Sequence, residues 1–187
     1  MQIKQENKSF GPKEIPPAGT YPGRLIWIVD MGTHETAYNG EKKNRREVRL
    51  TWELTELPMS NPEKFFVVGK KYNATLYKSN LLATIESMTG QPLSFDASGV
   101  FDMKSLLGMP CMITVVHKVD DGTTYANVGS VGPIPTLKGK KIDVDAAHNH
   151  LISFGLDPED WDQDTFDMLP EWMQKIIQTS PEYKAIK

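Results

Sequence analysis

Five lysine and arginine side chains fall between positions 42 and 49 of a chain whose formal net charge is −3. Two more lysines follow Gly69 directly. Such a density of cations suits a phosphate backbone, because each cation that neutralises a phosphate releases a bound counterion. A solvated loop is the alternative for an isolated run of charge. We predict a nucleic-acid-binding surface formed by Lys42, Lys43, Arg45, Arg46, Arg49, Lys70 and Lys71.

Aromatic side chains near these cations would supply flat surfaces on which unpaired bases stack. Tyr38 adjoins an Asn-Gly turn and has no evident core to enter, so it is one stacking candidate. Tyr125 shares its strand face with polar and small residues and is the second. Trp52 instead alternates in step with Val48 and Leu50, which predicts a place in the core.

Carboxylates near the C-terminus follow part of a calcium-loop pattern. Asp160, Asp162 and Asp164 stand at the first, third and fifth positions of such a loop, and Glu171 stands at its last. The sixth position needs glycine for a sharp turn and holds Thr165 instead. The pattern therefore argues against a calcium site.

Other catalytic and metal-binding chemistry lacks the residues it needs. His148 and His150 form an H-x-H pair, but Cys111 is the only thiol and lies in a predicted strand, so zinc ligands are missing. No P-loop, nucleophile-elbow or H-E-x-x-H motif is present. We expect no cofactor and no enzyme. The alternatives are a metal-dependent nuclease built from the C-terminal aspartates, which would need a rigid two-metal cage, and a protein-interaction adaptor.

The segments that would position these residues are mostly strands. An apolar stripe between Ser79 and Gly90 predicts a capped helix, and residues 101–108 predict a further helical turn. Strands are predicted over 20–30, 46–56, 64–77, 109–119 and 123–133. A mainly β fold of this order, with minor α, is that of a five-stranded OB-fold-like Greek-key barrel with a helix between strands 3 and 4. A small β-sandwich or another β-barrel is the alternative.

Three local features refine this prediction. The Asn39-Gly40 hairpin signal, in a polar stretch, predicts a long connection over residues 31–44. The strand over 46–56 places Trp52 on an apolar face and Arg49 on a polar one, which indicates a half-buried strand. Gly69 predicts an interruption of the third strand, such as a bulge.

Composition divides the chain into four segments. Residues 1–19 form an extended arm, 20–135 the OB-fold-like domain, 136–155 a linker and 156–187 an acidic helical tail without a second core. Residues 1–141 carry net +4 (18 − 14) and residues 142–187 net −7 (3 − 10). The tail could therefore compete with a nucleic acid for the basic surface, or bind a protein partner through Trp161, Phe166 and Trp172.

The sequence also favours a cytoplasmic location. Its single cysteine cannot form an internal disulfide, as is common in a reducing compartment. No stretch reaches the ~18 apolar residues of a membrane span, and the polar N-terminus lacks the apolar core of a signal peptide. We expect a protein without a membrane partner.

Several framework motifs resemble a family of bacteriophage-encoded single-stranded DNA-binding proteins of OB type. They are "PPAGTYPGRLIWIVDMGT", "REVRLTWEL", "SNLLATIESMTGQPL", "FDMKSLLGMPCMITVVHK" and "LPEWMQKIIQTSPEY". The resemblance runs from Pro16 to Tyr183 and implies a protein that coats single-stranded DNA during phage replication or recombination in the host cytoplasm. We expect replication or recombination proteins to bind through the acidic tail, and self-association of the chain. The chain departs from the family by ending in "EYKAIK" rather than in an acidic tip with a terminal aromatic residue.

Overall fold

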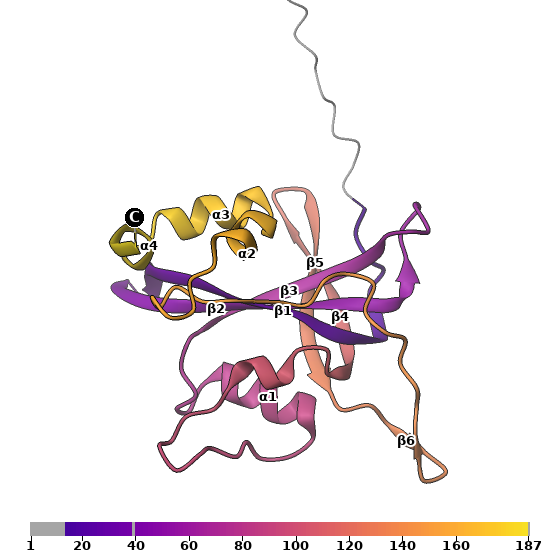
Figure 1. Ribbon diagram of the computed structural model, residues 1–187. Helices are drawn as coiled ribbons and strands as arrows, with labels where there is room; N and C mark the ends of the chain where they lie inside the picture. The colour runs from indigo at the N-terminus through magenta and orange to yellow at the C-terminus, as the bar shows by residue number, and fades with distance from the viewer. Residues whose placement is uncertain (1–13, 39, 187) are drawn as a thin grey trace, which may run out of the picture.

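The computed structural model describes residues 14–38 and 40–186, apart from the side chain of Tyr38. The fold is mainly β and is built on one antiparallel sheet of order β3-β2-β1-β4-β5 (Figure 1). A short strand, β8, pairs in parallel with the middle of β1. The strands are β1 (Gly19–Tyr38), β2 (Glu41–Pro58), β3 (Phe65–Asn73), β4 (Pro110–Asp120), β5 (Thr123–Gly132) and β8 (Ile152–Phe154), with β6 (Thr136–Leu137) and β7 (Lys140–Lys141) forming a separate small hairpin.

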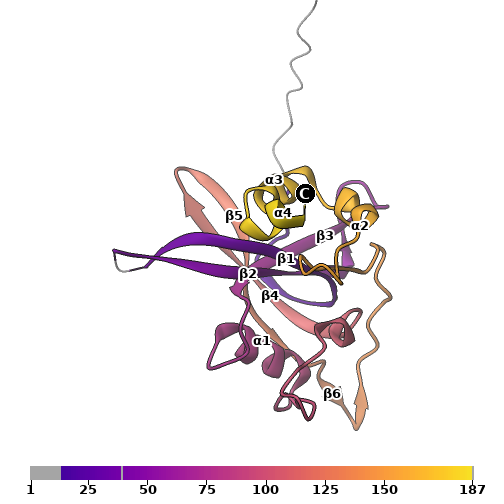
Figure 2. The same ribbon diagram turned by 60° about the vertical axis from the view of Figure 1, so that its left-hand side comes forward.

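Helices cover both faces of the sheet. Helix α1 (Asn80–Thr89) lies on one face, whereas α2 (Gln163–Met168), α3 (Glu171–Gln178) and α4 (Pro181–Ile186) lie on the other (Figures 1 and 2). The predicted caps of α1 are confirmed. Ser79 accepts a hydrogen bond from the Leu82 amide, and Gly90 ends the helix at φ 73°, a left-handed conformation that glycine adopts without a Cβ clash. The predicted turn near residue 101 is the short 3-10 helix η1 (Met103–Leu106).

The main core lies between the sheet and α1. Leu50, Trp52 and Leu54 of β2 are fully buried there. Ile85 and Met88 of α1 pack against the same cluster. The predicted apolar face of β2 and the predicted stripe of α1 are therefore confirmed.

The β1–β2 hairpin is longer than predicted. Residues 31–44 are not a polar connection, because β1 continues to Tyr38 and β2 begins at Glu41. Cross-strand hydrogen bonding holds this extension, and Glu35 forms an ion pair with Lys42 across it. Figure 2 shows the hairpin projecting well beyond the rest of the sheet.

A register shift in β1 divides its apolar residues between two cores. The ladder with β2 is irregular between Leu25 and Trp27. Simple alternation would place these two side chains on one face of the sheet. Leu25 instead packs in the core between the sheet and α1, whereas Trp27 packs on the opposite side of the sheet. Val29 and Met31 pack on the same side of the sheet as Trp27, in one hydrophobic cluster. A bulge of this kind inserts one residue and so exchanges the faces of those that follow.

The expectation of a tail without a second core is wrong. A second hydrophobic cluster lies on this side of the sheet. It combines Val29 and Met31 of β1 with Phe154, Leu156 and buried side chains of the segment from α2 to α3. The segment assigned to a linker also contributes β8 to the sheet. Burial of this much apolar surface makes the C-terminal segment part of the fold.

The sheet is not closed into a barrel. In the ladders of the described residues, β3 and β5 form the two free edges, although these edges approach each other in space. The predicted interruption at Gly69 is wrong as well, since β3 runs unbroken through it. Within the residues described, no helix is long and apolar enough to cross a membrane. Most of the predicted N-terminal arm, residues 1–13, lies outside the described part.

Candidate nucleic-acid interface

The lysines at the hairpin tip are exposed and already paired. Lys42 Nζ lies 2.8 Å from Glu35 Oε1, and Lys43 Nζ lies 2.8 Å from Glu41 Oε2. Exposed pairs of this kind are weak and screened by salt, so either lysine could exchange its partner for a phosphate. At the tip, the positive charges of Lys42 and Lys43 are therefore offset by the neighbouring carboxylates of Glu35 and Glu41.

Arg46 has a structural role. Its guanidinium forms ion pairs with Asp30 of β1 and, at 3.0 Å, with Asp157 of the C-terminal segment. Hydrogen bonding to Asp30 raises the pKa of Arg46 further, against the effect of burial. Arg46 therefore fastens the C-terminal segment to the hairpin. Its neighbour Arg45 lies opposite His34 and forms no ion pair in the part of the chain that the structure describes.

Arg49 differs from every other predicted cation. It projects from the polar face of β2 and lies over Gly69, where an added Cβ would come within 2.6 Å of Nη2. Its Nε is buried without a hydrogen-bond partner, and within residues 14–38 and 40–186 it forms no ion pair. Burial lowers its pKa. A cation held out of water without a counter-ion is costly, so this position favours an anionic ligand.

A hollow of about 440 Å³, here called the Arg49 hollow, opens beside this guanidinium. Its floor is the edge of β3, and its wall is the β4–β5 hairpin. Tyr125 is 51% exposed there and pairs across the hairpin with Lys118. The hollow is lined by Arg49, Val67, Val68, Gly69, Lys118, Asp120, Tyr125, Ala126 and Asn127.

Lys118 was missed by sequence reasoning, although a signal for it existed. The Asp121-Gly122 turn fixes the register of the hairpin, and that register places Lys118 opposite Tyr125. Like Arg49, Lys118 forms no ion pair among the described residues. Among the described residues, the hollow thus brings together two cations that form no ion pair, an exposed aromatic ring and a single carboxylate, Asp120.

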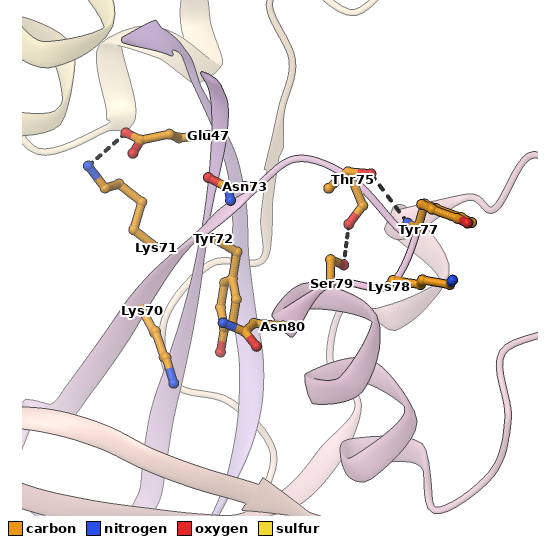
Figure 3. Close-up of a pocket in the computed structure, with 10 residues that line it drawn as sticks. All are labelled: Glu47, Lys70, Lys71, Tyr72, Asn73, Thr75, Tyr77, Lys78, Ser79 and Asn80. Atoms are coloured by element: carbon orange, nitrogen blue, oxygen red, sulfur yellow. Dashed lines mark hydrogen bonds and ion pairs between the residues drawn. The ribbon is translucent and has the colours of Figure 1, made fainter. Parts of the chain in front are cut away.

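A second hollow, of about 360 Å³, lies further along β3 at its junction with α1 (Figure 3). Lys71 points to Glu47, with 2.7 Å between Nζ and Oε2, and Lys70 lies over the Tyr72 ring at 5.5 Å. Tyr77 and Lys78 point away from these two lysines (Figure 3). The predicted pair Lys70 and Lys71 therefore lies near the Arg49 hollow along β3 but outside its lining.

The rest of the polar face of β2 is covered. Glu53 is fully buried and accepts hydrogen bonds from the backbone and side chains of His148 and Asn149. Burial alone would raise the pKa of Glu53, but these hydrogen bonds hold it below its usual range. Residues 148–149 therefore cover this end of the face, whereas Arg49 and Glu47 of the same face line the two hollows.

The aromatic residues of the tail do not form one surface. Phe166 is 3% exposed and packs with Trp161 at 5.5 Å between ring centroids. Both stabilise the second core, so neither offers a free surface to a partner without opening it. Trp172 is 48% exposed, and its ring lies 5.1 Å from the guanidinium carbon of Arg49.

The remaining candidates are the carboxylates of the tail and Tyr38. Asp162 caps α2, and its carboxylate oxygens accept hydrogen bonds from the Asp164 and Thr165 amides rather than facing a metal site. No group of three or more potential metal ligands occurs among the described residues. The side chain of Tyr38 lies outside the described part, so its predicted stacking role stays a prediction. The sequence matches no protein-family model and no curated protein.

Proposed function

We propose that the chain binds single-stranded DNA, with the strand passing through the Arg49 hollow. The observation that carries this proposal is the Arg49 guanidinium beside Lys118, because its Nε is buried without a hydrogen-bond partner and it forms no ion pair among the described residues. A phosphate would supply the missing counter-ion, and guanidinium groups suit phosphates because their fork of donors matches two oxygens.

The neighbouring ring supports a single strand over a duplex. Tyr125 is half exposed in a hollow only about 440 Å³ in volume. A tyrosine can stack on a base only when that base is free of its own stack, as in single-stranded nucleic acid. A duplex would present paired bases in its grooves and would not reach the ring.

We further propose that the sheet is an open variant of an OB fold. The order β3-β2-β1-β4-β5, with α1 between β3 and β4, supports this assignment. OB folds are partly open Greek-key barrels that bind oligonucleotides with the face of strands 2 and 3 and the loop between strands 4 and 5. The Arg49 hollow is lined by residues of β2 and β3 and by residues of β4 and β5 that flank the turn between those two strands.

The family resemblance supports a biological setting. We propose that the protein coats single-stranded DNA during phage replication or recombination in the host cytoplasm. Replication or recombination proteins, and further copies of the chain, are the partners to test first.

A binding titration tests the proposal. Single-stranded DNA, duplex DNA and RNA of equal length are titrated at several salt concentrations against the wild type, Arg49→Gln and Lys140→Gln, the last an exposed lysine of the separate β6–β7 hairpin. We expect the wild type to prefer the single strand, Arg49→Gln to weaken binding and to flatten the salt dependence by about 0.7 per lost phosphate contact, and Lys140→Gln to change little. Equal loss from both variants, or no binding of any strand by the wild type, would overturn the proposal.

A further inference from the structure

We infer that Trp172 is a second base-stacking surface of the Arg49 hollow, so that the C-terminal segment completes the nucleic-acid site. This inference rests on the proposed function. It assigns to a tail residue the same ligand that Arg49 and Tyr125 would bind.

The Trp172 indole lies beside Arg49 and is partly open to solvent. The guanidinium carbon of Arg49 lies over the Trp172 ring, 5.1 Å from its centroid. This contact uses one face of the ring, yet 48% of the residue remains exposed. An aromatic ring with one face on a cation and much of its surface open to solvent can accept a base on its free face.

The helix that carries Trp172 is firmly anchored. Met173 and Ile177 on α3 are buried in the second core at 1% and 0% exposure. Gln174 donates from Nε2 to the Leu169 carbonyl at 2.8 Å, which fixes the start of the helix. The ring is therefore held in place before any ligand arrives, and a preorganised surface loses less entropy on binding.

One aromatic ring thus lies against the Arg49 guanidinium, and another lines the same hollow. Tyr125 lines the hollow from β5, and Trp172 approaches Arg49 from α3. A single strand alternates phosphates with bases, so a phosphate on Arg49 brings its neighbouring bases towards these rings. A cation between stacking aromatics is the general pattern of single-strand binding sites.

Three carboxylates of the tail are paired with cations other than Arg49. Asp157 pairs with Arg46, Asp160 with Lys104, and Glu171 of α3 with its own Lys175 at 2.6 Å. What the tail presents to Arg49 is an indole. The arrangement therefore differs from an acidic tail that mimics DNA, and it favours a tail that contributes to the site.

The test uses the full chain and an oligothymidylate longer than the roughly 4–16 nucleotides that one OB fold covers. Trp172→Ala should weaken binding roughly 5- to 150-fold, and Trp172→Phe, which keeps a ring, should weaken it less. Met168→Ala removes an exposed apolar side chain of α2 and is the matched control, with no expected change. Binding should also quench tryptophan emission in the wild type, and Trp172→Phe should abolish most of that quenching.

The outcomes separate the two proposals. If the wild type binds no single strand, the proposed function fails. If the wild type binds and Arg49→Gln weakens it, while both Trp172 variants bind as tightly as the wild type, this inference alone is overturned and Trp172 is left for a protein partner. Should Trp172→Ala fail to fold, the emission of Trp172→Phe decides: quenching as strong as in the wild type contradicts a base on Trp172.

Discussion

His148 Nδ1 lies 2.8 Å from Oε1 of Glu53, and this contact ties the segment after β7 to the centre of the sheet. The His148 amide donates to the same oxygen at 2.8 Å, while the Asn149 amide and Nδ2 donate to Oε2. The imidazole also stacks on Phe65 with 3.5 Å between ring centroids. One buried carboxylate thus fixes the course of the chain before it reaches β8 and the helices of the tail.

Replacing this carboxylate should destabilise the protein in a pH-dependent way. Glu53→Gln should cost about 3 kcal/mol or more of unfolding free energy at pH 7, since hydrogen bonds to charged groups contribute about 1.5–3 kcal/mol each. The pKa of Glu53 is lower in the folded than in the unfolded protein, so its stabilisation is present above the unfolded pKa and is lost as the pH falls through the folded one. Urea unfolding at a series of pH values measures this.

The wild type and Glu53→Gln should converge in stability in acid, where the wild-type carboxylate is protonated. A Glu56→Gln variant is the matched control, because Glu56 is an exposed residue of the same strand. A gap between Glu53→Gln and wild type that is constant from neutral to acid pH would contradict the assignment.

Truncation before Leu156 should unfold or aggregate the protein. The deletion removes Phe166, Met173 and Ile177 and exposes Val29 and Met31 on the sheet. Single large-to-small changes in a core already cost about 2–5 kcal/mol, and this deletion removes a whole cluster. Circular dichroism and size-exclusion chromatography measure the outcome. A soluble, cooperatively folding truncation that binds single-stranded DNA more tightly would instead support a tail that competes with DNA.

Gly69→Ala should weaken nucleic-acid binding while leaving the fold intact. The new methyl would lie 2.6 Å from Arg49 Nη2, the far end of a flexible side chain, so the guanidinium would move rather than the backbone. Displacing Arg49 would separate it from the phosphate position and from Trp172. Binding and thermal unfolding are measured side by side with Gly132→Ala, a glycine of β5 with open space at its Cβ. Unchanged affinity in Gly69→Ala would show that the present position of Arg49 is not needed.

Substitutions of Arg46 and Arg49 should differ in their effect on stability. The Arg46 variant should lower the free energy of unfolding, whereas the Arg49 variant should affect nucleic-acid binding instead. Arg46→Gln breaks the ion pairs to Asp30 and Asp157 and should cost about 1–3 kcal/mol of unfolding free energy. This is less than the 3–5 kcal/mol of a fully buried pair, because Arg46 is 34% exposed. Arg49→Gln removes a buried charge without an ion pair among the described residues and should preserve stability or raise it. Chemical unfolding of both variants measures this, and a larger loss from Arg49→Gln would reverse the assigned roles.

Local sequence patterns identified the main-chain elements. Alternation in β2 placed Trp52, Leu50 and Leu54 in the core, and the caps of α1 were evident from Ser79 and Gly90. Both signals depend on residues a few positions apart, so they survive without knowledge of the rest of the chain. The register shift after Leu25 had no such signal, because a bulge depends on the partner strand.

The sequence by itself determined a mainly β chain with five long strands, the helix between the third and fourth, and a concentration of cations on one hairpin. Only the tertiary structure decided which of those cations are available. Arg46 is paired with two carboxylates, one of them more than a hundred residues away, whereas Arg49, three residues on, is half-buried with no ion pair among the residues described. The reason is that the residue type alone sets the charge of a side chain. Its counter-ion can come from a segment that is distant in the sequence, and only the tertiary structure decides which segment packs against it.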